Sequence, residues 1–172
     1  MTGLRLRDDD RPHEECGIFG AYGTTDAAAL TTLGLHALQH RGQEACGIVS
    51  FDGDRFFQHR AIGLVGDAFG DSGVVNGLSG YAAIGHVRYS TTGETVLRNV
   101  QPLYADFHFG GLAIAHNGNL TNALPIRRER VERGSLFQST TDTEILQHLI
   151  STSRRGKLLD RVIADRMAIC GA

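Results

Sequence analysis

The chain has 172 residues, of which 41% are hydrophobic and 21% charged, and this size and balance predict one globular domain. A formal net charge of −2 gives no sign of a nucleic-acid partner or an anionic membrane surface. No apolar run approaches the roughly 18 residues that span a bilayer, and three cysteines are too few for a disulfide framework, so we expect a cytoplasmic protein.

Residues 1–15 form a polar leader, and Cys16 follows it directly. The leader lacks the apolar stretch of a secretory signal. It is either a frayed N-terminus or a propeptide, whose removal would leave Cys16 with a free α-amine beside its thiol. An internal cysteine has only the thiol, which is mostly protonated and unreactive at neutral pH. The chemistry of this residue therefore depends on whether the leader is removed.

The first half of the chain predicts short strands and one helix. Residues 16–23 mix apolar residues with glycine, which indicates a buried strand. Residues 26–41 carry apolar side chains at helical spacing, and Asp26 is a candidate N-cap. The segments 46–51 and 55–61 predict two strands joined by a hairpin turn.

The second half predicts two more strands and then a run of helices. The apolar runs 81–87 and 112–115 predict strands, and a polar cluster follows each of them. Helices are predicted at 121–134, 142–153 and 157–167. Strands that are grouped before helices favour an α+β fold over alternating βαβ units.

The polar clusters supply the groups that an amide-hydrolysing site needs. Asn117-Gly118 offers a side-chain amide and a backbone N–H to a developing oxyanion, although Asn-Gly is also an ordinary turn sequence. Arg88 and the hydroxyl residues after it could bind a carboxylate, or form a structural pair. Asp142 could bind an ammonium group, or cap a helix. Together with Cys16, these groups match an amino acid that has an amide side chain.

A metal site has little support in the sequence. His36 and His40 stand four residues apart on the predicted helix, but the glutamate of a zinc-binding H-E-x-x-H motif is missing between them. The cysteines form no C-x-x-C pair. We therefore expect no metal ligands, and we expect Cys46, which has apolar neighbours, to be a small core residue.

Four arginines of the helix predicted at 121–134 could suggest phosphate binding. Their spacing instead allows pairs with glutamates one helical turn away, such as Glu129 with Arg133. A solvated, self-paired face is therefore the preferred interpretation for Arg127, Arg128, Arg130 and Arg133.

Five segments occur in an order that carries a specific resemblance. They are 16–18 (CGI), 39–44 (QHRGQE), 86–91 (HVRYST), 116–120 (HNGNL) and 139–144 (STTDTE). In this order they resemble the class II, or N-terminal nucleophile, glutamine amidotransferases. The second and third segments most resemble the glutaminase domains of the amidophosphoribosyltransferases. The resemblance covers the chain from about residue 14 to about residue 164.

The resemblance implies a reaction and a role for each matching residue. Cys16 would attack the side-chain amide of glutamine, form a γ-glutamyl thioester and release ammonia, with its own α-amine as the general base. Asn117 and the N–H of Gly118 would form the oxyanion hole. The remaining residues would bind L-glutamine: Arg88 and Thr91 its α-carboxylate, Asp142 its α-ammonium group, and Arg41 and Gly42 a loop that closes over it.

The resemblance also implies the four-layer αββα sandwich of N-terminal nucleophile hydrolases over residues 16–172, with 1–15 as a propeptide. We expect this sandwich to be C-terminally incomplete, and therefore poorly stable, because the family continues with further strands. A phosphoribosyltransferase domain is expected to be absent, because no phosphoribosyl-pyrophosphate loop occurs. No cofactor is expected in this segment, and Mg²⁺ and, in some relatives, an iron–sulfur cluster are implied only for the missing C-terminal part.

In the full-length enzyme, which the resemblance implies to be a homo-oligomer, ammonia would pass to phosphoribosyl pyrophosphate in the first step of de novo purine synthesis. Two alternatives stay open. One is a class II amidotransferase with a different ammonia acceptor. The other is an inactive fragment that at most binds glutamine.

Overall fold

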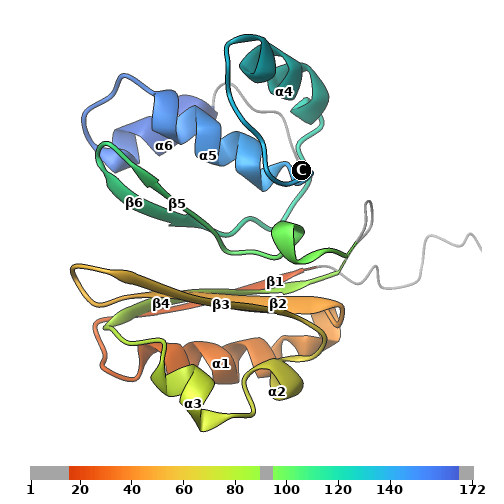
Figure 1. The fold of residues 1–172 in the computed structure, drawn as a ribbon, viewed down its shortest axis with the longest axis vertical. Helices are drawn as coiled ribbons and strands as arrows, with labels where there is room; N and C mark the ends of the chain where they lie inside the picture. Colours follow the sequence, from red (N-terminus) through yellow and green to blue (C-terminus); the bar gives the residue numbers. More distant parts are fainter. Residues whose placement is uncertain (1–15, 90–94, 167–172) are drawn as a thin grey trace, which may run out of the picture.

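The computed structural model describes residues 16–89 and 95–166, and within them helices and strands form four layers (Figure 1). The first layer holds three helices: α1 (Ala27–Ala37), α2 (Val65–Ala68) and α3 (Ser72–Asn76). A four-stranded sheet and then a two-stranded sheet form the middle layers. The last layer holds three more helices: α4 (Ala123–Glu132), α5 (Thr143–Thr152) and α6 (Leu158–Arg166). This order confirms the expected α+β fold with an αββα arrangement.

The larger sheet is antiparallel, with the strand order β1-β4-β2-β3. Its members are β1 (Gly17–Tyr22), β2 (Ala45–Phe51), β3 (Phe56–Ile62) and β4 (Ala82–Arg88). β4 is paired on both sides, and its register places Val87 opposite Gly17 of β1. Cys16 therefore lies beside the end of β4, where Arg88 is located.

The smaller sheet is a hairpin of β5 (Leu103–Phe107) and β6 (Gly110–Ile114). The short 3-10 helix η3 (Leu97–Asn99) leads into it from the large sheet. The expected strand at 112–115 corresponds to the second half of β6, whereas β5 was not predicted. Because β6 ends at Ile114, the loop that carries Asn117 begins just beyond it.

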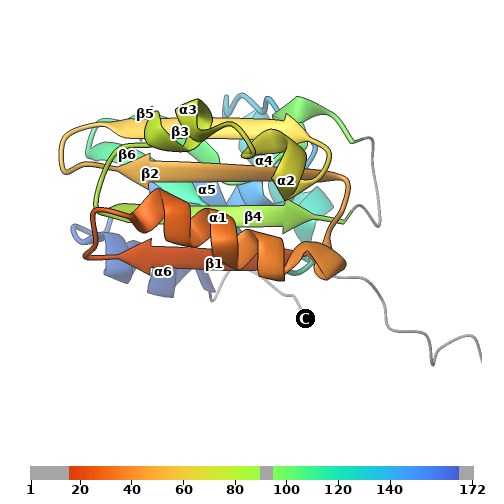
Figure 2. The same cartoon turned by 90° about the horizontal axis from the view of Figure 1, so that it is seen from below.

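Helix α1 packs on β1 and β4, while α2 and α3 lie on the side of β2 and β3 (Figure 2). One face of α1 buries Ala27, Thr31 and Leu35, which are spaced one helical turn apart. A Cβ atom at Gly85 of β4 would lie 2.7 Å from the side chains of Thr31 and Leu35, so glycine is needed for this close approach. Cys46 belongs to the same core, as predicted, and burial raises the pKa of its thiol to about 12.

The predicted helix at 26–41 is divided in the structure. α1 ends at Ala37, and a 3-10 helix, η2 (Gln39–Arg41), follows. His36 and His40 therefore do not share one helix, which corrects that expectation. Asp26 occupies the N-cap position but makes no capping hydrogen bond with its side chain.

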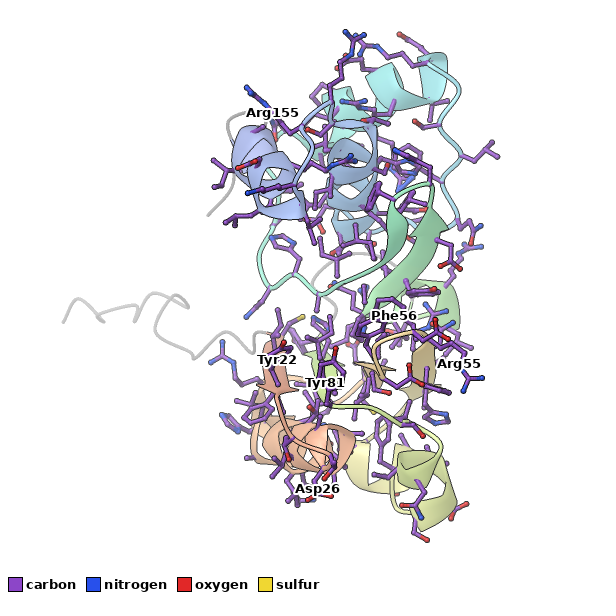
Figure 3. All side chains as sticks on the ribbon, turned by 90° about the vertical axis from the view of Figure 1, so that its left-hand side faces the viewer. Tyr22, Asp26, Arg55, Phe56, Tyr81 and Arg155 are labelled. Atoms are coloured by element: carbon purple, nitrogen blue, oxygen red, sulfur yellow. The ribbon has the colours of Figure 1, made fainter. Side chains whose placement is uncertain are left out.

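An apolar cavity of about 440 Å³ lies between the two sheets and is lined by residues of all four strands of the large sheet and of β6. Among the described strands, β1 and β6 each pair with one neighbour only. At the far end of β1 from Cys16, the ring of Tyr22 lies against Tyr81, and Phe56 lies nearer the small sheet (Figure 3). The apolar lining and the open strand edges agree with low stability, which stays a prediction.

Candidate functional site

A second cavity, of about 510 Å³, lies where the start of β1, the end of β4, the loop after β6 and the start of α5 meet. It is lined by both polar and apolar groups. Four of the predicted site residues line it: Cys16, Arg88, Gly118 and Asp142. The structure thus brings together residues from four separate segments of the sequence.

The thiol of Cys16 lies against the backbone of Tyr89, the residue after β4. Its Sγ is 3.4 Å from the Tyr89 nitrogen and 3.4 Å from the Tyr89 carbonyl oxygen. The carbonyl can accept a hydrogen bond from the S–H group, and the N–H can donate one to the sulfur. This contact fixes the sulfur beside Arg88, at the wall of the cavity.

The carbonyl oxygen of Cys16 accepts two hydrogen bonds from predicted site residues. Asn117 donates through Nδ2 at 2.7 Å, and Arg41 donates through Nε at 3.3 Å. An amide nitrogen has two protons, so Asn117 keeps a second N–H for another acceptor. These bonds hold Asn117 and Arg41 next to the residue expected to react, although neither lines the cavity itself.

The Asn117-Gly118 segment lies in an irregular loop between β6 and α4. Gly118 has a φ of +146°, a backbone conformation that residues with a Cβ atom rarely adopt. The loop is a bend without a regular hydrogen-bonded turn. Glycine is therefore required at this position of the cavity wall, where its N–H is the expected donor to the oxyanion.

Asp142 occupies the N-cap position of α5, but its carboxylate does not cap that helix. One oxygen accepts a hydrogen bond from the Leu120 N–H at 2.8 Å, and the other lies 3.8 Å from Nδ1 of His116. Burial raises the pKa of Asp142, but the His116 ring and the backbone N–H groups outweigh it, so the net shift is downward. The cavity therefore contains a carboxylate that is ionised at neutral pH.

Gly42 lies behind the end of β4 and does not belong to the cavity wall. A Cβ atom at Gly42 would lie 2.7 Å from the carbonyl carbon of Arg88, so glycine lets this loop pass close to the end of β4. Gly42 supports the backbone of Arg88 and does not line the cavity. Thr91 lies outside the described residues, as does the leader.

Arg127 is not a solvated surface residue, which corrects the interpretation of the four arginines. Its guanidinium donates to the carbonyl oxygen of Ser139 at 2.7 Å and lies 3.8 Å from Glu144. It also stacks on the ring of Phe137. The expected pair of Glu129 and Arg133 does form, at 2.7 Å. Arg127 therefore fixes the loop before Asp142, while the surface pairing is correct for Arg133.

His86, on β4, is a buried histidine beneath the site. Its side chain is 0% exposed, and among the described residues neither ring nitrogen has a hydrogen-bond partner. Burial, and then the nearby Arg88 and His116, lower the pKa of this ring to about 3. The ring is therefore neutral in the folded chain at every physiological pH.

We expect His86 to make the folded chain less stable in mild acid. The unfolded ring takes up a proton near pH 6.5 and the folded ring does not, so stability falls as the pH decreases below that value. Between pH 7 and pH 5.5 the loss is about 1 kcal/mol, or a few degrees in Tm. Thermal melting of His86→Gln should show a smaller change, whereas the exposed control His36→Gln should match the unsubstituted chain. An equal pH dependence in His86→Gln would contradict this account.

No group of three or more histidine, cysteine or acidic side chains that could hold a metal ion occurs in the described residues. Across residues 16–89 and 95–166, the helices are also too short or too polar to cross a membrane. The groups gathered around the cavity are a thiol, an amide, a guanidinium and a carboxylate. This set can bind an α-amino acid and attack a carbonyl group in its side chain.

Comparison with known proteins gives similarities over most of the chain. A family model described as a glutamine amidotransferase domain matches residues 70–162. The amidophosphoribosyltransferase of Rhizobium etli is 60% identical over 91% of this chain and 32% of its own length. That of Lacticaseibacillus casei is 52% identical over 80% of this chain and 71% of its own length.

The fold also matches solved structures. The glutamine phosphoribosylpyrophosphate amidotransferase from B. subtilis, complexed with ADP and GMP, aligns with a TM-score of 0.83 and 42% identity. The alignment covers 90% of this chain and 33% of that protein. The chain therefore spans about a third of the length of the Rhizobium etli and B. subtilis relatives.

Proposed function

Because the chain belongs to the glutamine amidotransferase family, and within it to the amidophosphoribosyltransferases, we propose that it hydrolyses glutamine through a thioester on Cys16. One arrangement carries the proposal: Cys16, Arg88 and Asp142 line a single cavity, and Asn117 donates a hydrogen bond to the carbonyl oxygen of Cys16. An inactive fragment that only binds glutamine would need no amide donor held against the backbone of Cys16.

The proposed reaction begins with removal of the leader, which exposes the α-amine of Cys16. The amine takes the thiol proton, and the sulfur attacks the amide carbon of the glutamine side chain. The second N–H of Asn117 and the N–H of Gly118 stabilise the oxygen that becomes negative. The tetrahedral intermediate then releases ammonia, which takes its proton from the ammonium group of Cys16. Water hydrolyses the remaining thioester to glutamate and restores the thiol.

Binding of the substrate is proposed to depend on two opposite charges. The guanidinium of Arg88 binds the α-carboxylate, with Thr91 as a further partner, and Asp142 binds the α-ammonium group. The side chain of Arg88 is buried and that of Asp142 is partly buried, so water screens their attraction for the substrate less than it would on the surface. Arg41 and Gly42 are proposed to close the adjoining loop over glutamine.

The acceptor of the ammonia is proposed from the relatives. Their names describe transfer to a phosphoribosyl compound, and the Rhizobium etli and B. subtilis relatives are about three times as long as this chain. We therefore propose that a longer enzyme, a cytoplasmic homo-oligomer, transfers ammonia to phosphoribosyl pyrophosphate in purine synthesis. The glutaminase step uses no cofactor, because the polypeptide supplies its nucleophile, base and donors. We assign no residue of this chain to Mg²⁺ or to an iron–sulfur cluster.

The proposed function can be tested with 6-diazo-5-oxonorleucine, an electrophilic analogue of glutamine. The processed chain should gain the mass of one adduct, and peptide mapping should place it on Cys16. Glutamine should be converted to equal amounts of glutamate and ammonia. A folded, processed chain that is neither labelled nor active would overturn the proposal.

Replacement of Asp142 by asparagine should weaken glutamine binding specifically. The amide keeps an oxygen for the Leu120 N–H but removes the charge, and loss of one buried charged partner costs about 2 kcal/mol or more. We therefore expect KM to rise by at least about 30-fold with a smaller change in kcat. Asp54→Asn, on an exposed loop, is the matched control. An unchanged KM would remove Asp142 from the substrate site.

A further inference from the structure

The segment from the last residue of η3 to the start of β5 contains two buried polar side chains that the mechanism above does not use. Asn99 is 1% exposed and Gln101 is 5% exposed. Buried polar groups are normally hydrogen-bonded, so their partners show what these side chains hold in place. Neither residue was predicted from the sequence, because no motif marks them.

Asn99 connects the two charged ends of the substrate cavity. Its Nδ2 donates to Oγ1 of Thr140 at 2.9 Å, and its Oδ1 accepts from the Thr140 N–H at 3.0 Å. Its backbone carbonyl accepts from Nη1 of Arg88 at 3.3 Å. Thr140 stands two residues before Asp142, so a single asparagine links the guanidinium to the segment that carries the carboxylate.

Gln101 contacts the loop that carries the oxyanion donors. Its Oε1 accepts from the backbone N–H of His116 at 2.7 Å, and its side chain lines the cavity. His116 directly precedes Asn117, so this bond fixes the start of the Asn117-Gly118 segment.

The segment is itself anchored to the large sheet. Arg60 of β3 donates to the carbonyl of Val100 at 3.2 Å. A Cβ atom at Gly47 of β2 would lie 2.5 Å from the Gln101 carbonyl oxygen, so the segment lies directly against that strand. Asn99 and Gln101 therefore connect the loops of the cavity to the large sheet.

We propose that Asn99 and Gln101 are positioning residues with separate tasks: Asn99 sets the spacing of Arg88 and Asp142, and Gln101 sets the oxyanion loop. This inference rests on the proposed glutaminase function. The α-carboxylate and α-ammonium groups of glutamine are attached to one carbon atom, so their two partners must keep a fixed spacing. The oxyanion exists only during the reaction, so its donors affect turnover more than binding.

The test is a comparison of kcat and KM between variants of the two residues. Asn99→Ala should raise KM for glutamine on the order of tenfold and leave kcat within about threefold. Thr140→Val, which removes only the bond from Asn99 Nδ2, should shift KM in the same direction by a smaller factor. Gln101→Met should lower kcat on the order of tenfold or more, with KM nearly unchanged. Asn76→Ala, exposed on α3, is the control.

Labelling of Cys16 gives a second readout that general damage to the fold would change differently. 6-Diazo-5-oxonorleucine requires the amino-acid contacts, whereas iodoacetamide requires only an accessible thiol. Asn99→Ala should slow the first reaction and not the second. The positioning role of Asn99 is wrong if Asn99→Ala and Thr140→Val slow labelling by the glutamine analogue and by iodoacetamide equally. It is also wrong if these variants lower kcat and leave KM unchanged. If the unsubstituted, processed chain has no glutaminase activity, the proposed function is overturned, and this inference with it.

Discussion

Cys16→Ala is expected to abolish glutamine hydrolysis, with a fall in kcat on the order of 10⁶-fold, the loss seen when a serine protease loses its nucleophile. The sulfur lies between the Tyr89 backbone and the cavity that contains Arg88 and Asp142. Alanine removes the only group in this position that can form a covalent bond with the substrate carbon. The measurement is glutamate release, together with the mass of the protein after treatment with 6-diazo-5-oxonorleucine.

Cys46→Ala is the matched control for that experiment. Cys46 is fully buried, and burial keeps its thiol protonated, so it should not react with the analogue. The control should keep the adduct and the activity, although loss of a core side chain lowers stability. Adduct formation that persists in Cys16→Ala would place the nucleophile elsewhere in the chain.

Retention of the leader is expected to lower kcat by about 10²- to 10⁴-fold, the usual contribution of a general base. In the unprocessed chain the nitrogen of Cys16 belongs to a peptide bond and cannot accept a proton. The comparison is between a chain that starts at Cys16 and the Glu15→Pro variant, in which the bond to be cut for leader removal joins a proline to Cys16. Intact mass establishes which N-terminus each preparation has.

The processed form of the unsubstituted chain is the control for the leader. It should match the chain made to start at Cys16 in both kcat and KM. Equal turnover by a chain whose mass shows an intact leader would mean that another group acts as the base. His116 would then be the candidate, because it lies beside Asp142 at the cavity wall.

The three helices of the second half of the chain were predictable from the sequence to within about two residues, whereas the helix expected at 26–41 ends four residues early. The helices expected at 142–153 and 157–167 correspond to α5 and α6. Shorter elements were missed for a physical reason. α2 and α3 contain four and five residues, too few to show a helical repeat, and β5 (Leu103–Phe107) alternates weakly and depends on its pairing with β6.

The site was predictable only where a residue has a chemical task of its own. Cys16, Arg88 and Asp142 stand in motifs, and the structure places them in one cavity. Asn99 and Arg127 act through hydrogen bonds to distant loops, and such contacts leave no pattern in a single sequence. The helical spacing of the arginines predicted a surface pair correctly for Arg133 but could not show that Arg127 turns inward.

The cavity crosses the boundary between the two halves of the sandwich. Arg88 belongs to the large sheet and Cys16 directly precedes its strand β1, whereas Gly118 and Asp142 belong to loops of the other half. A sliding movement of one half over the other would therefore change the distance between the nucleophile and the carboxylate while each half kept its own structure. A bound amino acid that contacts both halves opposes this shear, so occupancy of the site and rigidity of the whole domain are thermodynamically linked.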